Sequence, residues 1–341
     1  MSIFVTGGAG FIGSQFIRDW VARYPSIPVV NFDKLTYAGN LANLKSVASH
    51  PNYSFYRGDI CDRNALLEAM PRNVDAIIHF AAESHVDRSI HGAAEFVRTN
   101  VLGTQEVLDV ARERKARRFV HISTDEVGGS MKPGEWLNED SPLDPRSPYA
   151  ASKAAAEHLV RAAGSTFGLD YVITRTSNNY GPFQFPEKLL PLAILNALDD
   201  QPIPVYGDGL QVRDWVHVAD NCRALRDVMR FGHAGHTYHI GGGSPQTNLQ
   251  VLRALLRLLN KPESLRKTVT DRLGHDRRYA VDYSKTEREL LWSPRIPFGE
   301  GLLETIIWYR ENTEWTRSVR NGEYQQYYQM QYGGFNAATV A

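Results

Sequence analysis

The stretch Thr6-Gly7-Gly8-Ala9-Gly10-Phe11-Ile12-Gly13 separates a short apolar run, Ile3 to Thr6, from a segment with apolar residues at helical spacing. The glycines at this spacing allow a tight turn, close approach of a pyrophosphate to the backbone, and packing of the helix on the strand. The helix N-terminus would then present its backbone N–H groups to phosphate oxygens. A glycine-rich turn alone is a weak signal, but this context predicts a dinucleotide site.

Short apolar, β-branched runs alternate with helical patterns through the first half of the chain. This alternation predicts an α/β fold with a Rossmann-type, doubly wound parallel sheet. The expected strands are Ile3 to Thr6, Val29 to Phe32, Tyr53 to Tyr56, Ala76 to Phe80, Phe119 to Ser123 and Tyr171 to Thr174.

From about Asn178, prolines and glycines break the chain into short pieces, which is typical of a smaller, partly irregular lobe. We expect residues 1–177 to form the dinucleotide-binding domain, rejoined by about 214–240. Residues 178–213 and 241–341 would form the C-terminal substrate domain.

Composition excludes several classes of function. The chain has 341 residues, with 38 basic and 38 acidic side chains, so no overall field attracts nucleic acid or an anionic membrane. Cys61 and Cys222 lie far apart and outside any CxxC or His-rich context, which predicts reduced thiols and no metal. No signal-peptide pattern and no run of about 18 apolar residues occurs. We expect a cytoplasmic enzyme.

Asp33 closes the second predicted strand about 20 residues after the glycine turn, where dinucleotide folds place a carboxylate. Such a carboxylate can accept both ribose hydroxyls of NAD and would repel a 2′-phosphate. Lys34, a neighbouring cation, could instead tolerate NADP. NAD is the cofactor that we expect.

Tyr149 and Lys153 are four residues apart and therefore neighbours on one helical face. A charged Lys153 is expected to favour the phenolate and to lower the pKa of Tyr149 from about 10. Tyr-x-x-x-Lys is common on ordinary helices, but Ser123-Thr124-Asp125-Glu126 ends a predicted central strand at its carboxyl end, where doubly wound folds bind ligands.

The glycine turn, Asp33, Ser123-Thr124 and the Tyr149/Lys153 pair together resemble the extended short-chain dehydrogenase/reductase superfamily, which implies NAD chemistry. Within it, the chain resembles the dTDP-glucose 4,6-dehydratase family along essentially its whole length. The segments that carry this resemblance are Ala82-Glu83-Ser84-His85-Val86-Asp87-Arg88-Ser89, Thr124-Asp125-Glu126-Val127, Ser177-Asn178-Asn179-Tyr180-Gly181-Pro182 and Gly274-His275-Asp276-Arg277-Arg278-Tyr279.

The resemblance implies a division of catalytic roles. Tyr149 would take the proton of the C4 hydroxyl, helped by Thr124 at O4, while hydride passes to NAD. Glu126 would remove the C5 proton and protonated Asp125 would donate to the leaving C6 hydroxyl, before hydride returns to C6. Elimination of water needs this second acid and base in addition to the tyrosine, with separated pKa values.

The resemblance also implies ligand contacts elsewhere. Expected cofactor contacts are Gly7, Gly10, Phe11, Ile12, Gly13, Asp33, Lys34, Asp59, Ile60, Ala81, Ala82, Asn100, Ser123, Tyr149 and Lys153. Expected contacts of a nucleotide sugar are Ser84, His85, Thr124, Asn178, Lys188, Tyr206, Arg213, Asn248, Asp271, Arg272 and His275. A homodimer is expected through the helix around Glu106 to Arg114 and the helix that starts near Tyr149.

Alternative functions stay open at this point. The substrate could be a UDP-hexose, because the expected nucleoside contacts do not distinguish a thymine base from a uracil base. A 4-epimerase or glucuronate decarboxylase is disfavoured by Asp125-Glu126, since those families usually lack the acid pair. A catalytically inactive NAD-binding sensor could lose Tyr149, Lys153, Asp125 or Glu126. This alternative is disfavoured because all four residues are present. One departure from the family is Gly128, where a Tyr usually follows Glu-Val, and it bears on rate, pocket shape and sugar choice.

Overall fold

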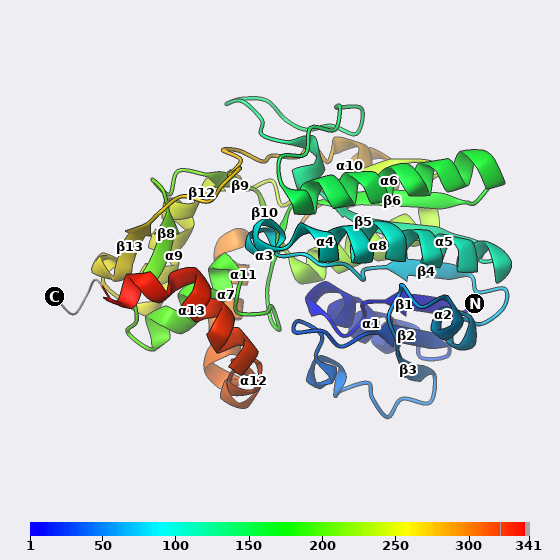
Figure 1. The fold of residues 1–341 in the computed structure, drawn as a ribbon, viewed down its shortest axis with the longest axis horizontal. Helices are drawn as coiled ribbons and strands as arrows, with labels where there is room; N and C mark the ends of the chain where they lie inside the picture. Colours follow the sequence, from blue (N-terminus) through cyan, green and yellow to red (C-terminus); the bar gives the residue numbers. More distant parts are fainter. Residues whose placement is uncertain (321, 338–341) are drawn as a thin grey trace.

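The computed structural model describes residues 1–320 and 322–337, and a seven-stranded parallel sheet with strand order β11-β6-β5-β4-β1-β2-β3 forms its centre (Figure 1). Neighbouring strands all pair in parallel. The strands are β1 Ile3–Thr6, β2 Val29–Asp33, β3 Tyr53–Arg57, β4 Ala76–His79, β5 Phe119–Thr124, β6 Tyr171–Thr176 and β11 Thr237–Ile240. Because the order from β3 to β6 is that of a doubly wound dinucleotide fold, the predicted fold class is confirmed.

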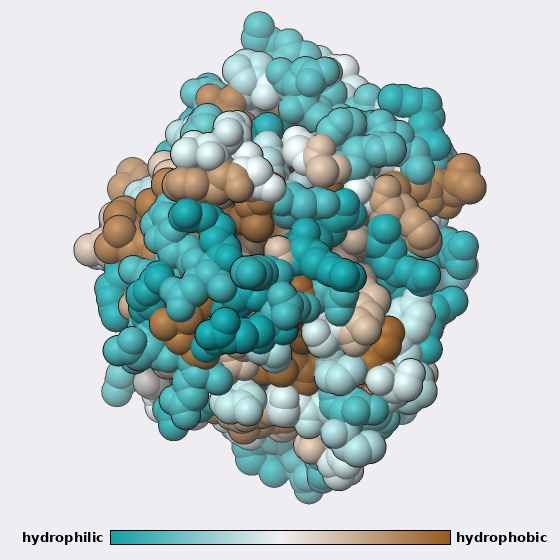
Figure 2. All heavy atoms as spheres, turned by 90° about the vertical axis from the view of Figure 1, so that its right-hand side faces the viewer, coloured by the Kyte–Doolittle hydropathy of each residue, from teal (hydrophilic) through white to brown (hydrophobic). Residues whose placement is uncertain are grey.

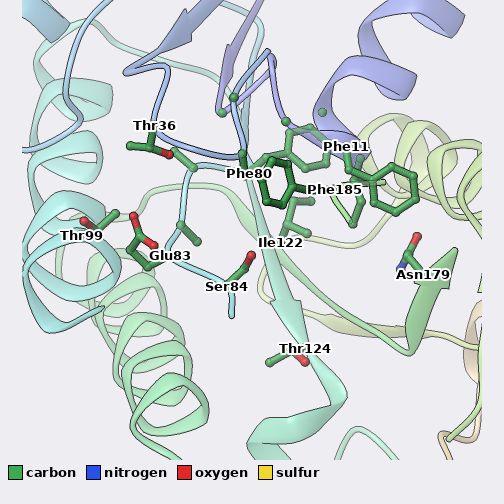
Figure 3. Close-up of a pocket in the computed structure, with 18 of the residues that line it drawn as sticks. Phe11, Thr36, Phe80, Glu83, Ser84, Thr99, Ile122, Thr124, Asn179 and Phe185 are labelled. Atoms are coloured by element: carbon green, nitrogen blue, oxygen red, sulfur yellow. The ribbon is translucent and has the colours of Figure 1, made fainter. Parts of the chain in front are cut away.

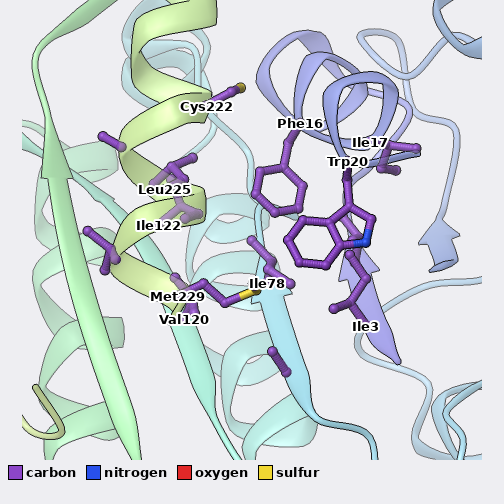
Figure 4. Close-up of a cluster of buried hydrophobic side chains, with 14 of the residues drawn as sticks. Ile3, Phe16, Ile17, Trp20, Ile78, Val120, Ile122, Cys222, Leu225 and Met229 are labelled. Atoms are coloured by element: carbon purple, nitrogen blue, oxygen red, sulfur yellow. The ribbon is translucent and has the colours of Figure 1, made fainter. Parts of the chain in front are cut away.

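Helices cover both faces of this sheet, and alternate strand residues point to each. On one face, side chains of α1 (Phe11–Arg23) and α8 (Val218–Phe231), among them Trp20 and Leu225, pack against Ile3 and Ile78 (Figure 4). On the other face, Phe4 faces α2 Arg63–Ala69, α5 Thr104–Glu113 and α6 Pro148–Phe167. The two-sided burial explains why the strands read as continuous apolar runs.

The second lobe lies beside the carboxyl ends of the central strands (Figure 1). Its core contains leucines and isoleucines of α7, α9 and α11, together with Tyr180 and Trp215. Its elements are β7 Asn178–Tyr180, α7 Leu189–Leu198, β8 Ile203–Tyr206, β9 Val212–Arg213, β10 Trp215–His217, β12 Gln246–Thr247, α9 Asn248–Leu259, β13 Arg266–Val269, α11 Phe298–Glu311, α12 Thr313–Val319 and α13 Gly322–Ala337. The lobe therefore faces the edge of the sheet where ligands bind in such folds.

Short helices complete the chain. They are α3 Val86–His91, α4 Ala93–Phe96, a π-helix at Val97–Gly103, α10 Ser284–Leu290, and 3₁₀ turns at Leu41–Leu44, Asp125–Gly128 and Glu263–Leu265. β11 brings residues 237–240 into the central sheet, and Trp292 packs in the same core as α1. The expected domain boundaries stay a prediction.

The molecular face at the amino ends of the strands is mostly polar, with separate small hydrophobic areas (Figure 2). Among the described helices, none has the length and hydropathy needed to cross a bilayer.

Candidate active site

The turn between β1 and α1 uses its three glycines in different ways. Gly7 has a φ of +70°, and a Cβ there would lie 2.5 Å from the backbone nitrogen of Ala81. A Cβ on Gly13 would lie 2.4 Å from the Gly7 carbonyl oxygen, so this position needs glycine for close packing. A Cβ on Gly10 would meet only the Gly7 oxygen, at 3.3 Å, so Gly10 leaves space at the start of α1. These observations fit a backbone cradle for a pyrophosphate.

A cavity of about 320 Å³ begins at this turn and runs along the carboxyl ends of the central strands. Nearly all the expected cofactor contacts line it: Gly7, Gly10, Phe11, Ile12, Gly13, Asp33, Lys34, Asp59, Ile60, Ala81, Ala82, Ser123, Tyr149 and Lys153. Asn100 lies behind the wall instead, where its amide donates to the Ser152 hydroxyl at 2.9 Å and to the Glu83 carbonyl at 3.0 Å. Most of these residues therefore share one cavity, and their contact with a cofactor stays a prediction.

Other lining residues were missed by sequence reasoning: Thr36, Ala38, Gly39, Thr99, Asn179, Gln184, Phe185 and Glu187. Figure 3 shows Phe11, Phe80 and Phe185 grouped together, with Thr36, Glu83 and Thr99 along a separate part of the wall. Thr36 and Gly39 follow β2, so the rule that ligands bind beyond strand carboxyl ends could have found them. Phe185 and Glu187 lie on a loop whose path the sequence does not fix.

Asp33 is held in one orientation at the end of β2. Its two carboxylate oxygens accept the backbone N–H groups of Ala9 at 2.9 Å and Leu35 at 2.8 Å. A carboxylate can accept further hydrogen bonds, so this arrangement leaves capacity for ribose hydroxyls. The ammonium group of Lys34 lies 2.9 Å from the Asp59 carboxylate, so its charge is already paired.

The acid pair follows β5 directly in a 3₁₀ turn that Thr124 caps. The Thr124 hydroxyl accepts the Glu126 N–H at 3.2 Å and donates to Oδ1 of Asp125 at 3.2 Å. Oδ2 of Asp125 is buried and makes no hydrogen bond to the described residues. One oxygen of Asp125 is thus fixed and the other is available to a ligand.

Burial and the neighbouring Glu126 carboxylate raise the pKa of Asp125 to about 8. Burial also raises the pKa of Glu126, but the positive charges of Arg213, Arg272 and Lys188 oppose this shift. Since two adjacent carboxylates in a low-dielectric site do not ionise equally, Asp125 keeps its proton at neutral pH more readily than an ordinary aspartate.

Tyr149 and Lys153 lie on the first turns of α6, which Ser147 caps by accepting the Ala150 N–H at 3.1 Å. The expectation that Lys153 lowers the pKa of Tyr149 was wrong: burial and the Glu126 carboxylate raise the pKa of this phenol well above its usual value. The ammonium group of Lys153 instead donates to the Ile122 carbonyl at 2.6 Å, and burial lowers the pKa of Lys153 to about 8.

A second cavity, of about 150 Å³, adjoins the first in the other lobe and shares Glu126, Asn178 and Lys188 with it. Of the expected substrate contacts, His85, Tyr206, Arg213, Asn248, Arg272 and His275 also line this second cavity, whereas Ser84 and Thr124 line the first. Asp271 lies outside both and accepts a hydrogen bond from His275 at 2.6 Å. Glu126 therefore stands where the two cavities meet, and Asp125 lines the first cavity beside it.

Asp87 organises the far wall of the second cavity and was not among the predicted contacts. Its buried carboxylate lies 2.5 Å from the Arg272 guanidinium and accepts the Tyr206 hydroxyl at 3.0 Å. Arg213 is oriented separately, by the Asp276 carbonyl at 2.9 Å and by the Tyr279 ring at 4.3 Å. Asp87 lies two residues after His85, in the same family-like segment of residues 82–89. Its position in that segment was the sequence signal that could have identified it as a residue of the site.

The space beside Gly128 is filled by Leu137: a Cβ on Gly128 would lie 2.3 Å from a Leu137 methyl group. Leu137 is 1% exposed, and its backbone is held by the Ala280 carbonyl at 2.9 Å. We expect Gly128→Tyr, which restores the usual family residue, to overpack this region and to lower the free energy of unfolding by about 1–3 kcal/mol. Denaturant unfolding measures this loss.

A double variant supplies the control for this prediction. Because Leu137→Ala removes the obstructing methyl groups, we expect Gly128→Tyr to cost less in that background than alone. Equal costs in both backgrounds would show that Leu137 is not the obstacle.

The fold and the two cavities define an NAD-dependent enzyme of the extended short-chain dehydrogenase/reductase class. The family model described as GDP-mannose 4,6 dehydratase matches residues 4–305. A dTDP-glucose 4,6-dehydratase of Streptomyces niveus is 50% identical over 325 residues, which cover 94% of this chain and 96% of the relative. The chain belongs to the dTDP-glucose 4,6-dehydratase family.

Two solved structures place the chain within its superfamily. The crystal structure of DesIV, a dTDP-glucose 4,6-dehydratase from Streptomyces venezuelae with NAD and TYD bound, is 52% identical with a TM-score of 0.90, and the match covers 92% of this chain and 98% of DesIV. A UDP-glucose 4-epimerase of Thermus thermophilus in complex with NAD reaches a TM-score of 0.84 at 30% identity, covering 92% of this chain and 100% of the epimerase. The fold is therefore common to both activities, and the sequence identity is higher to the dehydratase, 52%, than to the epimerase, 30%.

Proposed function

We propose that this chain uses NAD to convert dTDP-glucose to dTDP-4-keto-6-deoxyglucose with loss of water. The observation that carries the proposal is the Asp125-Glu126 pair: buried Asp125 lines the cofactor cavity together with Tyr149, and Glu126 lines both that cavity and the substrate cavity. Oxidation at C4 requires only one base, whereas elimination across C5 and C6 requires an additional acid and base. The sequence identity to dehydratases supports the same conclusion.

The oxidation step uses residues on β5 and α6. Bound NAD supplies the hydride acceptor for C4 and later the hydride donor for C6. Tyr149 takes the proton of the C4 hydroxyl, and the Thr124 hydroxyl, which accepts the Glu126 N–H, turns its proton from Oδ1 of Asp125 to O4 when the sugar binds. Burial and the Glu126 carboxylate oppose ionisation of the phenol in the chain alone, so Tyr149 would act as a base only with the positive charge of the oxidised nicotinamide nearby, to which Lys153 would add.

The elimination step uses the acid pair. The new C4 ketone acidifies the C5 proton, which Glu126 removes, while Asp125 donates its proton from the unbonded Oδ2 to the C6 hydroxyl, and water leaves. The proton on Glu126 then returns to C5 as hydride returns to C6. Transfer of one proton from Tyr149 to Asp125 through solvent then restores both groups, so the net change is loss of one water, with no net redox change.

The diphosphate is held by the cations and amides of the second cavity: Asn178, Lys188, Arg213, Asn248 and Arg272. Lys188 is held by the Ser84 carbonyl at 2.8 Å, next to the acid pair. Charge-assisted hydrogen bonds from these groups can neutralise the diphosphate. We assign the nucleoside to Tyr206 and His275, which line the same cavity, and to Asp271, which accepts a hydrogen bond from His275.

A panel of nucleotide hexoses tests the choice of substrate. We expect dTDP-glucose to lose the mass of one water in the presence of this chain and to do so with a higher kcat/KM than UDP-glucose. Mass spectrometry of the products, with each sugar supplied separately, measures both. A preference for the UDP sugar would reassign the nucleobase, and inversion at C4 without loss of water would make the chain an epimerase.

We also propose that the chain forms a homodimer in the cytoplasm. In this dimer, α5 and α6 of one subunit would pack against α5 and α6 of the other. Exposed apolar side chains near these helices support it, since Leu102 is 59% exposed and Phe167 is 54% exposed. Cys61 and Cys222 are free thiols, which suits a reducing compartment. Light scattering should give twice the chain mass at micromolar concentration. A monomer mass that does not change with concentration would contradict the dimer.

A further inference from the structure

The loop that follows Asp33 connects the cofactor cavity to the substrate lobe. Thr36, Ala38 and Gly39 line the cofactor cavity. Tyr37, in the same loop, reaches across to the other lobe, where its hydroxyl donates to Oε1 of Glu187 at 3.1 Å and its ring meets that of Phe185 edge-on at 5.4 Å. One wall of the cofactor cavity is therefore tied to a loop that leads into α7.

Glu187 receives a second bond on its other oxygen. Nε of Arg88 donates to Oε2 at 3.0 Å, and the Glu187 side chain is only 1% exposed. The Arg88 guanidinium in turn lies over the Tyr37 ring at 3.8 Å and over the Tyr327 ring of α13 at 4.4 Å. Tyr37 and Arg88 thus meet at the buried Glu187 carboxylate, and Arg88 connects this group to Tyr327 of α13.

The backbone around Glu187 is also anchored. Its carbonyl accepts a hydrogen bond from the His85 ring at 3.3 Å, and the neighbouring Lys188 donates to the Ser84 carbonyl at 2.8 Å. Because this loop is fixed to the segment at residues 84–88, the bond from Tyr37 attaches the cofactor loop to a rigid partner. Glu187 also lines both cavities.

The contact between Tyr37 and Glu187 has a role in the reaction, and this role rests on the proposed function. Hydride leaves C4 and must return to C6, so the reduced cofactor has to stay bound while water is eliminated. We propose that Tyr37, Glu187 and Arg88 form a latch between the two lobes that retains the cofactor until hydride is returned. These three are positioning residues, and none of them exchanges a proton or hydride with the sugar.

Two conservative variants test the latch in the holoenzyme. Tyr37→Phe keeps the ring against Arg88 and Phe185 but removes the hydroxyl, and Glu187→Gln keeps the shape but removes the charge. Because a hydrogen bond to a charged group is lost, we expect NADH to dissociate about tenfold faster from each. Dissociation is followed by the fluorescence of bound NADH, and Tyr56→Phe, on an exposed tyrosine of β3, is the control.

Leakage during turnover is the second readout. An added NADH-oxidising enzyme consumes only cofactor that escapes, so the latch variants should lose NADH in the presence of dTDP-glucose while the wild type and Tyr56→Phe do not. The double variant Tyr37→Phe/Glu187→Gln should release NADH no faster than Glu187→Gln, because both changes weaken the same contact between Tyr37 and Glu187. Additive effects would mean that the residues act separately, and the latch would be rejected.

The outcomes separate this inference from the proposed function. Folded variants that release NADH at the wild-type rate would overturn the latch, whether or not the wild type dehydrates dTDP-glucose. A wild-type chain that fails to dehydrate the sugar, with variants that release NADH faster, would overturn the function and keep the latch. Thermal unfolding of each variant, which should match the wild type within a few degrees, excludes a general loss of structure.

Discussion

Tyr149→Phe is expected to remove oxidation at C4 almost completely, with a loss of about 10²–10⁴-fold in rate. The phenylalanine keeps the ring on the first turn of α6, so the fold and NAD binding should persist, while the oxygen that accepts the C4 proton is gone. Single-turnover reduction of bound NAD, followed by absorbance after addition of dTDP-glucose, measures the step directly.

Tyr171 offers a matched control for this variant. It is a tyrosine on β6 with the same exposed fraction as Tyr149, 9%, and it lies outside both cavities. Tyr171→Phe should reduce NAD at close to the wild-type rate. If Tyr149→Phe turned over at the wild-type rate as well, Tyr149 would not be the base.

Asp125→Asn and Glu126→Gln should each slow dehydration by about 10²–10⁴-fold and yet leave the reduction of bound NAD in place. The asparagine keeps the shape of the side chain but has no carboxyl proton to give to the leaving hydroxyl. The glutamine cannot remove the C5 proton, so exchange of that proton with deuterated solvent should stop in Glu126→Gln. Quenched reactions analysed by mass spectrometry report water loss and deuterium content together.

The pH dependence of the dehydration rate tests whether Asp125 is the general acid. In the proposed mechanism Asp125 acts in its protonated form, and since its pKa is raised to about 8, we expect dehydration to proceed at neutral pH and to fall as the pH rises through about 8. The pKa of Lys153 is lowered to about 8 as well, so oxidation should weaken in the same range. The two steps are measured separately in Asp125→Asn. The rate of NAD reduction in this variant should still fall at alkaline pH. The slow residual rate of water loss, measured after NAD reduction, should no longer follow the titration of Asp125.

A failure of the acid variants to reduce NAD would change the catalytic roles that are assigned to these residues. If either acid variant bound NAD and substrate but did not reduce NAD, Asp125 or Glu126 would take part in oxidation, and the division between Tyr149 and the acid pair would be wrong.

Much of the fold followed from local patterns in the sequence. The glycine turn and Asp33 each depend on backbone geometry within one β-α-β unit, so spacing alone located them. No strand was predicted at Thr237-Tyr238-His239-Ile240, because only its pairing with β6, a long-range contact, makes it a strand of the central sheet.

The parts of the site that were missed depend on long-range contacts. Glu187 meets Tyr37 across 150 positions and Asp87 meets Arg272 across 185, and no local pattern encodes such pairs. The pKa of Tyr149 was predicted in the wrong direction because the sequence shows its i+4 neighbour Lys153 but not its burial beside Glu126. The filling of the space at Gly128 by Leu137 likewise appears only in three dimensions.

The central claim is that hydride leaves and returns within one site while water is lost. The direct measurement is incubation of the purified chain with dTDP-glucose deuterated at C4, followed by mass spectrometry of the product and absorbance of free NADH. The account predicts a product lighter by one water that carries the deuterium at C6, with no accumulation of free NADH. Steady accumulation of NADH with an unaltered C6 hydroxyl, or deuterium lost from the product, would contradict it.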